Sequence, residues 1–556
     1  MRFTSIVKGR ICVEGEDRSS VGCGSWHDGG MCEQEVRVTN VRVPGTDNIV
    51  DVTIQDGMIA SVQPSSNEDK QNRGELLPES NYTAAYTETI NAGGRWVIPG
   101  LWDGHTHFTQ WASTFGRLDL LRAGSAHEAM TMLREYLEER RESMGGLEPD
   151  SIVVGMRFRH SLWADSEQPT LAMIDEAAGG QPVALSSADM HCGWVNSAAA
   201  ERLGVHVGES GLVGELEWFD AYCKLDDANG KEQRRLVKAA EKDAASKGVV
   251  GICDYEMADT IAQWTSRFEH GINRLRVRVG VYPERLESVI EEGWHGGDEI
   301  PGSNGLAKVT TLKLISDGSL NTRSAYCSRP YSGVNPPTRG VLSYTPDEIE
   351  RYMTLAHEHG FDVACHAIGD EANSVVLDAF EHTGATGAIE HAQLLKARDI
   401  PRLAANGLTA SIQPQHAVDD RDVVPRYWGE MIAQSKAASA DEELMPFAYR
   451  SLLNADVSLR FGSDAPVAVL DPWVAMAAAV YRTDDDRPAD AHEQTLNIRT
   501  ALAASTFGHG TQVAEGDPAD LVLLDADPYA VRTAEALRTM SVAATMCAGC
   551  WTHFAL

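Results

Sequence analysis

Two histidines separated by one residue, His105 and His107, follow a short apolar segment that begins at Val97. Side chains on a β-strand alternate between its two faces, so both imidazoles project to the same side, about 7 Å apart. Two imidazoles in this arrangement suit one divalent metal ion. Such pairs also occur by chance on surface strands, so the assignment depends on further ligands elsewhere in the chain.

Three more residues with metal-binding side chains, His366, His391 and Asp464, lie at the ends of other predicted strands. Each histidine taken alone has an alternative interpretation as a buried structural residue. Taken together, four imidazoles and a carboxylate at strand ends are hard to explain by packing. Unpaired imidazole nitrogens need a partner, and a divalent cation satisfies them directly. The pattern therefore predicts a metal centre.

Lys313 lies between Leu312 and Leu314 in another apolar segment. If its face of the strand points inward, burial lowers the pKa of the amine, because the charged form loses its hydration. A neutral amine can react with carbon dioxide to give a carbamate, an anionic ligand able to bridge two metal ions. The alternative is an ordinary ion pair with Asp317, and we favour the carbamate.

A scaffold is needed to bring these distant strand ends together. From residue 97 to residue 509 the sequence alternates apolar β-type segments with helical ones, such as the segment 346–359. Eight strands are predicted, at 97–108, 249–254, 276–281, 309–315, 362–366, 388–391, 408–413 and 459–464. This order favours an α/β protein with a (β/α)8 TIM barrel, in which active sites lie at the carboxyl ends of the strands.

The segments outside the barrel predict three further regions. Short β-type segments at 35–96 and 510–556 predict one small β-sandwich domain built from both termini, although two unrelated ends are the alternative. Residues 1–34, rich in Gly, Ser, Asp and Glu, predict a poorly structured leader. Residues from about 150 to 245 are too many for one strand–helix connection, so we expect an insertion after the first barrel strand that shapes the substrate pocket.

The composition excludes several classes of partner. Lys and Arg number 48 against 81 Asp and Glu, a net charge of −33 that disfavours nucleic acid. There is no apolar run long enough for a membrane helix and no signal-peptide core, so a cytoplasmic protein is expected. Ten cysteines in 556 residues do not form a disulfide framework. Cys547 and Cys550 have the spacing of a redox or zinc pair without a second pair, and a homodimer is left open.

Several motifs resemble those of the amidohydrolase superfamily, in particular its YtcJ-like branch (amidohydrolase family 3). The matching segments are 98–107, 194–199, 313–320, 366–370, 389–393, 413–416, 462–466 and 519–525. The resemblance extends from about residue 35 to the carboxyl terminus. The sequence departs from the family pattern in three places: the leader, the short segment 514–518 and the segment 547–550. None of them contains a predicted metal ligand.

The resemblance implies the barrel, the terminal β-sandwich and a metal-dependent hydrolysis. One or two divalent cations, zinc by default, would activate a water molecule and polarise a carbonyl. Asp464 would then carry the proton to the leaving nitrogen. The implied metal-ligand positions are His105, His107, Lys313 (as the carboxylated lysine), His366, His391 and Asp464.

Residues that contact the substrate are predicted less directly. His391, His416 or Arg323 is a candidate donor to the oxyanion. The aromatic residues of the insertion either line the pocket or are buried in a small subdomain. The complete set of candidates for substrate contacts is Trp163, His191, Trp194, Asp317, Arg323, Gln413 and His416.

The expected reaction is hydrolysis of a C–N bond next to a carbonyl in a small molecule, such as an N-acyl amine or a formamide. The bond type follows from the resemblance and not from any single residue. Three alternatives remain open: deamination or cyclic-amide opening at the same metal centre, a non-hydrolytic lyase such as a decarboxylase, and a binding protein without catalysis.

Overall fold

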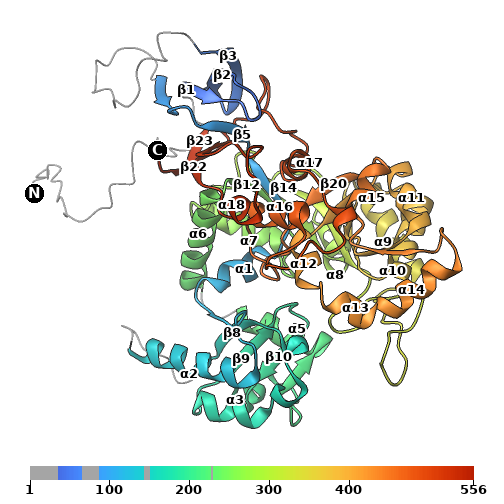
Figure 1. Ribbon diagram of the computed structural model, residues 1–556. Coiled ribbons are helices and arrows are strands. Elements are labelled where there is room, and N and C mark those ends of the chain that lie inside the picture. Colours follow the sequence, from blue (N-terminus) through green and yellow to red (C-terminus); the bar gives the residue numbers. More distant parts are fainter. Residues whose placement is uncertain (1–34, 66–86, 143–150, 227–229) are drawn as a thin grey trace, which may run out of the picture.

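The computed structural model describes residues 35–65, 87–142, 151–226 and 230–556. They form a barrel, a sheet built from both ends of the chain and an inserted α/β unit (Figure 1). In Figure 1 the terminal sheet and the insertion lie at opposite ends of the molecule. The predicted leader, residues 1–34, lies outside the described residues.

The predicted barrel is confirmed. Eight parallel strands form one sheet, and its two edge strands meet through a bridge between Thr106 and Ala465 and a hydrogen bond from Asp464 N to His105 O (2.8 Å). In spatial order the strands are β6 (Leu101–Thr106), β12 (Val249–Asp254), β13 (Arg276–Val281), β14 (Ala307–Ile315), β15 (Asp362–Ala367), β16 (Gly387–His391), β18 (Thr409–Ile412) and β20 (Ser458–Phe461).

Helices surround this sheet and bury an apolar face against it. In α9 (Pro346–Glu358), Ile349, Met353 and Ala356 recur at helical spacing and are buried, and Thr345 and Glu348 form a reciprocal capping box at its start. The other helices packed around the barrel are α1 (Phe108–Thr114), α6 (Gly230–Ser246), α7 (Thr260–Glu269), α8 (Pro283–Glu291), α10 (Asp370–Thr383), α11 (Ile400–Ala405), α15 (Tyr449–Asn454), α16 (Pro472–Tyr481) and α17 (Ile498–Ala504).

The apolar segment that precedes the two histidines forms two strands, where one was predicted. β5 (Trp96–Pro99) pairs with β21 (Leu521–Leu524) in the terminal sheet, whereas β6 belongs to the barrel. Gly100 lies between them, and a Cβ atom there would be 2.4 Å from Val250 Cγ2. The chain therefore passes from one domain to the other at a position that only glycine fits.

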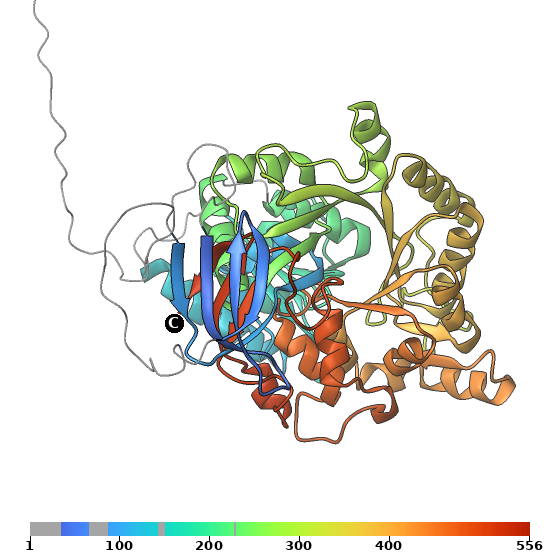
Figure 2. The same cartoon turned by 90° about the horizontal axis from the view of Figure 1, so that it is seen from above.

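The terminal sheet contains strands from both ends of the chain, as predicted. Figure 2 shows its N-terminal and C-terminal strands side by side, in blue and red. Cys547 and Cys550 face each other across the turn of its last hairpin, and the buried Cys547 Sγ lies 3.5 Å from Val250 O. Besides β5 and β21, its strands are β1 (Glu35–Arg42), β2 (Ile49–Gln55), β3 (Met58–Pro64), β4 (Thr87–Asn91), β22 (Val542–Cys547) and β23 (Cys550–Phe554).

The insertion begins earlier and ends earlier than the predicted range of about 150–245. Its sheet starts at Leu118, and α2 (Ala126–Glu142) packs on α3 (Leu171–Ala178) in its core, while α6 packs on the barrel. The remaining elements are β7 (Leu118–Asp119), β8 (Val153–Phe158), β9 (Val183–Ser187), β10 (Cys192–Val195), β11 (Leu212–Gly214), α4 (Ser197–Leu203) and α5 (Glu215–Asp226). Among all described residues, no helix is both long and apolar enough to span a bilayer.

Candidate metal centre

Asp464 and the two histidines of the first barrel strand meet at the carboxyl end of the barrel. His105 lies near the end of β6, His107 directly follows it, and Asp464 follows β20. Asp464 Oδ1 lies 3.4 Å from His105 Nε2 and 3.3 Å from His107 Nε2. Two ligand atoms on one tetrahedral zinc ion, each at about 2.0–2.1 Å, are about 3.3 Å apart. The spacing of these three side chains therefore fits a shared cation.

Three more imidazoles extend this group across the mouth of the barrel. The ring of His391, at the end of β16, lies 5.1 Å from that of His105 and 4.5 Å from that of His366 in β15. His416, in α12 (Pro414–Asp419), stacks on His391 at 5.7 Å, and its Nε2 lies 3.9 Å from Asp464 Oδ2. The two oxygens of Asp464 thus face two different histidine groups.

Several ring nitrogens of this cluster are buried without a hydrogen-bond partner in the described part of the chain. They are His107 Nδ1, His366 Nε2, His391 Nδ1 and His416 Nε2. A buried polar atom without a partner is costly unless a ligand satisfies it. Together with the ligand spacing around Asp464, the unpartnered nitrogens of His366, His391 and His416 fit one or two divalent cations.

The backbone at two of these residues is strained. His391 has φ 70° and Asp464 has φ 59°, in the left-handed region that side chains other than glycine rarely adopt. His391 is the last residue of β16, and Asp464 lies three residues after the end of β20. Strain of this kind persists where the surrounding structure holds a functional side chain in place.

Burial favours the neutral forms of His105 and His391, whereas Asp464 stays ionised and, against burial, raises the pKa of His107. Burial lowers the pKa of His105 to about 4, and burial beside His366 lowers that of His391 well below its usual range. For Asp464, burial opposes ionisation, but the neighbouring His105 and the hydrogen bond from His107 hold its pKa well below its usual range. Neutral imidazoles and a carboxylate are the forms that bind a cation.

Lys313 extends into the same cluster. The residue is 1% exposed, and its amine lies 3.3 Å from His105 Nε2 and over the ring of Tyr255, at 4.7 Å from the centroid. Burial lowers its pKa, as predicted. The alternative partner, Asp317, instead accepts hydrogen bonds from the backbone N–H groups of Tyr326, Ile368 and Gly369.

Glu390 was not among the predicted functional residues. It is fully buried, and its Oε2 lies 2.8 Å from His105 Nδ1. Although burial alone would raise its pKa, His105, Arg460 and Lys313 lower it to about 2. A carboxylate that accepts from Nδ1–H leaves Nε2 with a lone pair for a cation. The signal in the sequence was an acidic residue inside an apolar strand, immediately before His391.

Asp103 is a second buried carboxylate beside the cluster that was not among the predicted functional residues. Its Oδ1 accepts hydrogen bonds from His105 N (3.1 Å) and Ser463 N (2.9 Å), and so joins the first and last barrel strands beside Asp464. Burial raises its pKa to about 7, against the hydrogen bonds from Ser463 and His105. Asp103 therefore fixes the backbone that carries two of the ligand positions.

Two of the predicted substrate-binding residues lie behind the cluster. Asp317 is buried, its Oδ1 lies 3.4 Å from His366 Nε2, and its three backbone hydrogen bonds fix the loops that follow β14 and β15. Gln413 is 2% exposed and its amide lies 3.3 Å from His105 Nδ1. Both residues are placed to position histidines.

The aromatic residues of the insertion lie in its own core. Trp163 and Trp194 are 6% and 0% exposed, and their indole N–H groups donate to Ala123 O and Thr170 O. Of the two interpretations that the sequence left open, this placement matches buried aromatics of a subdomain. The sequence alone could not distinguish these two interpretations, because aromatic residues line pockets and fill cores alike.

The insertion nevertheless reaches the catalytic face of the barrel. Arg159 pairs with Asp419 of α12 at 3.0 Å, and Ser319 Oγ lies 3.4 Å from Asp189. His191, two residues after Asp189, is half-buried and contacts the ring of Phe219. Arg323 is exposed and lies over Tyr427 (5.4 Å), at the rim and not among the histidines.

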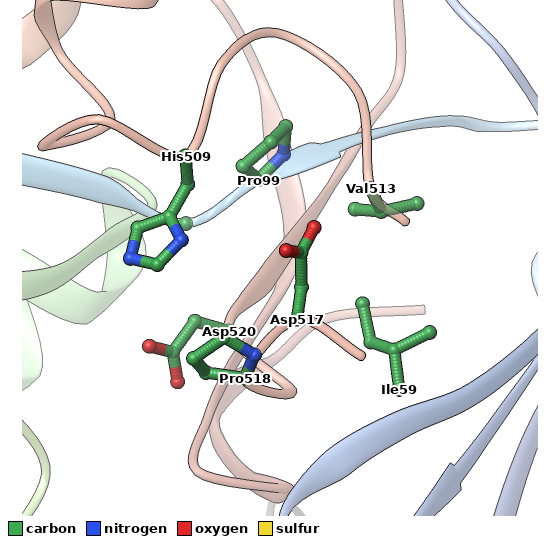
Figure 3. A pocket seen from close by; sticks show the side chains of 8 residues that line it. Ile59, Pro99, His509, Val513, Asp517, Pro518 and Asp520 are labelled. Carbon is green, nitrogen blue, oxygen red and sulfur yellow. The ribbon is translucent and has the colours of Figure 1, made fainter. Parts of the chain in front are cut away.

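A small pocket elsewhere in the molecule is lined by Ile59, Pro99, His509, Asp517 and Asp520 (Figure 3). It adjoins Gly100, where the chain enters β6, and so lies at the opposite end of that strand from His105. The pocket belongs to the joint between the terminal sheet and the barrel.

Comparisons with known proteins agree with this geometry. A family model described as "Amidohydrolase family" matches residues 88–552. The chain is 24% identical over 498 residues to YtcJ of Bacillus subtilis (strain 168), covering 82% of this chain and 89% of that protein. It is 24% identical over 525 residues to an N-substituted formamide deformylase of Arthrobacter pascens, covering 85% and 90%.

A solved structure has the same fold. It is the crystal structure of an uncharacterized metal-dependent hydrolase from Pyrococcus horikoshii OT3, with a TM-score of 0.70 and 23% identity. The likeness covers 90% of this chain and 99% of that one, so the barrel and its accessory parts share one architecture.

Proposed function

Because the chain belongs to the amidohydrolase family, and within it to the YtcJ-like branch, it is a hydrolase acting on C–N bonds, and we propose that its substrate is an N-acyl or N-formyl amine. One observation carries the catalytic part of the proposal: the buried carboxylate of Asp464 lies within 3.4 Å of His105 and His107 and faces His416 with its other oxygen. The acyl specificity rests on the likeness to the formamide deformylase.

In this proposal the residues that hold one or two divalent cations, with zinc as the default, are His105, His107, His366, His391 and Asp464. When bound, such a cation lowers the pKa of water towards about 7 and polarises a carbonyl. Asp464 takes the proton of the attacking water and delivers it to the leaving nitrogen. Its pKa, well below the usual range, keeps it ionised at neutral pH, the protonation state that a general base needs.

The remaining residues hold these groups in place. Glu390 fixes the ring of His105, so that Nε2 faces Asp464. Lys313 contributes as a carboxylated lysine, which its burial and lowered pKa favour. Intact-mass and crystallographic analysis of protein kept in bicarbonate tests that modification, with Lys313→Arg as the variant that cannot carry it.

The substrate class is tested by incubating the purified protein with N-substituted formamides and N-acyl amines. We expect release of formate or another carboxylate together with equimolar amine. Asp464→Asn should lower kcat by about 10²–10⁴, the usual contribution of a general acid–base. Asp347→Asn, at an exposed position of α9, is the matched control and should leave kcat unchanged. Ammonia from a ring amine, or carbon dioxide without hydrolysis, would instead favour deamination or decarboxylation.

A further inference from the structure

Two arginines share one tyrosine beside the mouth of the barrel. The guanidinium carbons of Arg323 and Arg426 lie over the ring of Tyr427, at 5.4 Å and 5.3 Å from its centroid. We propose that these two arginines form an anion subsite, which receives a carboxylate that the substrate carries away from its scissile C–N bond. The inference rests on the proposed function, because it names the class of N-acyl or N-formyl amine that this enzyme takes.

Both arginines belong to segments on the catalytic face of the barrel. Arg323 lies in the loop that follows strand β14, and Arg426 lies in α13 (Val423–Tyr427), the helix after α12. Asn321 joins the two segments, because its amide donates to Oδ1 of Asp420, directly after α12, at 3.0 Å. The two guanidinium groups therefore lie at the rim of the mouth that the histidines occupy.

The insertion contacts this rim from the other side. Arg426 Nη1 donates to the backbone carbonyl of Ser161 at 3.1 Å. The adjacent His160 is half-buried, and burial and the nearby charge of Arg323 lower its pKa, although Asp189 opposes the shift. The two arginines therefore lie where the insertion meets the catalytic face, as a residue that selects substrates should.

Neither guanidinium group is neutralised within the described part of the chain. Arg323 and Arg426 contact backbone carbonyls and the ring of Tyr427 there, but they form no ion pair. The carboxylates of the neighbouring segments have other partners: Asp419 pairs with Arg159, Asp420 accepts from Asn321 and Gln393, and Asp189 accepts from Ser187 and Ser319. In a chain with a net charge of −33, two cations on one ring without a counter-ion favour an anionic ligand.

The local structure holds Arg323 in place. Its φ of 60° lies in the left-handed region, which side chains other than glycine rarely adopt. Thr322 Oγ1 lies 2.9 Å from Ser319 Oγ and 2.6 Å from Ser324 Oγ, so hydroxyl groups fix the turn that contains it. Tyr427 is 8% exposed and gives both guanidinium groups a rigid surface. Backbone strain of this kind persists where a side chain is held for a function.

A carboxylate matches this subsite in both charge and shape. The guanidinium group presents parallel N–H donors to the two oxygens of a carboxylate, and it stays charged at every working pH. A neutral amide in the same position accepts fewer hydrogen bonds and carries no charge. We therefore expect a substrate whose carboxylate is joined to the formamide or amide by a spacer that extends from the histidines to the rim.

The test compares substrates that differ only in this charge. Formylamino-alkanoates of increasing chain length are compared with their primary amides, and kcat/KM is measured for each compound. At the chain length that spans the site, the carboxylate should exceed its amide by about 10-fold or more, the usual contribution of a hydrogen bond to a charged group. Arg323→Ala and Arg426→Ala should each reduce this preference, whereas Arg323→Lys, which keeps the charge, should retain part of it.

A second arginine on a tyrosine supplies the control. Arg351 lies over Tyr352 at 4.2 Å on the outer helix α9, but it has a carboxylate partner, Glu287, at 3.1 Å. Arg351→Ala should leave the ratio of the two kcat/KM values unchanged. Circular dichroism of each variant shows whether the fold is intact.

Equal kcat/KM values for carboxylates and amides at every chain length would overturn the subsite and leave the proposed function standing. A preference that survives in both alanine variants would also overturn it. If neither series is hydrolysed, the proposed substrate is wrong, and isothermal titration of the same two series decides on the subsite alone. Binding of a carboxylate but not of its amide, lost in Arg323→Ala, would support the subsite; equal binding of both compounds, or of neither, would refute it.

Discussion

Replacing Glu390 by glutamine tests how this protein prepares a histidine for metal binding. The carboxylate is fully buried and lies 2.8 Å from His105 Nδ1, with Arg460 Nη2 at 3.3 Å from its other oxygen. Glutamine keeps the volume and one acceptor oxygen but removes the charge. The His105 ring then loses both part of its orientation and the negative charge that strengthens its Nε2 as a ligand.

The expected magnitude follows from the kind of hydrogen bond that changes. A bond to a charged group contributes about 1.5–3 kcal/mol and a neutral one about 0.5–1.5 kcal/mol, so Glu390→Gln should cost about 1–2 kcal/mol. At 1.4 kcal/mol per factor of ten, zinc binding should weaken about 5- to 30-fold. Zinc affinity is measured by competition with a fluorescent chelator at fixed pH.

A second histidine–carboxylate pair supplies the control. Glu350 Oε1 lies 2.7 Å from His382 Nδ1 on the exposed outer face of α9 and α10, so Glu350→Gln changes the same chemistry away from the cluster. It should leave zinc affinity unchanged. Unchanged zinc affinity in Glu390→Gln, with an intact fold, would refute the orienting role of Glu390.

Three further predictions concern catalysis, pH and the joint between domains. His105→Ala should abolish turnover and leave the circular dichroism spectrum unchanged; retained activity would remove His105 from the ligand set. Burial raises the pKa of Glu241 to about 7, above its unfolded value of about 4.5, so the folded state binds the extra proton and stability falls as pH rises through this window. Glu241→Gln should reduce that loss of unfolding free energy by up to about 3 kcal/mol. The free energy of unfolding is measured with urea at pH 5 and at pH 8, and an equal change between these pH values in both proteins would contradict the prediction. Gly100→Ala should lower stability by about 1–3 kcal/mol, because its Cβ would lie 2.4 Å from Val250; an unchanged unfolding midpoint would show that the joint has room.

The barrel was predictable because its strands are short apolar runs separated by helices with clear start signals. The predicted strands at 249–254 and 276–281 match β12 and β13 at both ends, and the others deviate by one to a few residues. The first strand was predicted as one element because nothing in residues 97–108 marks Gly100 as a change of sheet. Only the packing of Val250 against it reveals that.

The ligand candidates were predictable for a similar reason: histidine and aspartate at strand ends meet when the strands close a barrel. Residues that act through others were harder to find. Glu390 and Asp103 lie in strands whose inward face the sequence does not reveal, and the pairing of Glu390 with His105 spans 285 positions. The roles of Trp163 and Trp194 depended on the boundaries of the insertion. The insertion begins at Leu118, well before residue 150, where the sequence predicted its start.

The metal content of the purified protein is the most direct measurement of the central claim, that His105, His107, His391 and Asp464 converge to bind a divalent cation. We expect at least one equivalent of tightly held metal per chain, and we expect the double variant His105→Ala, Asp464→Asn to lose it without loss of the fold. Protein that binds no divalent cation, even after incubation with excess zinc at neutral pH, would contradict it.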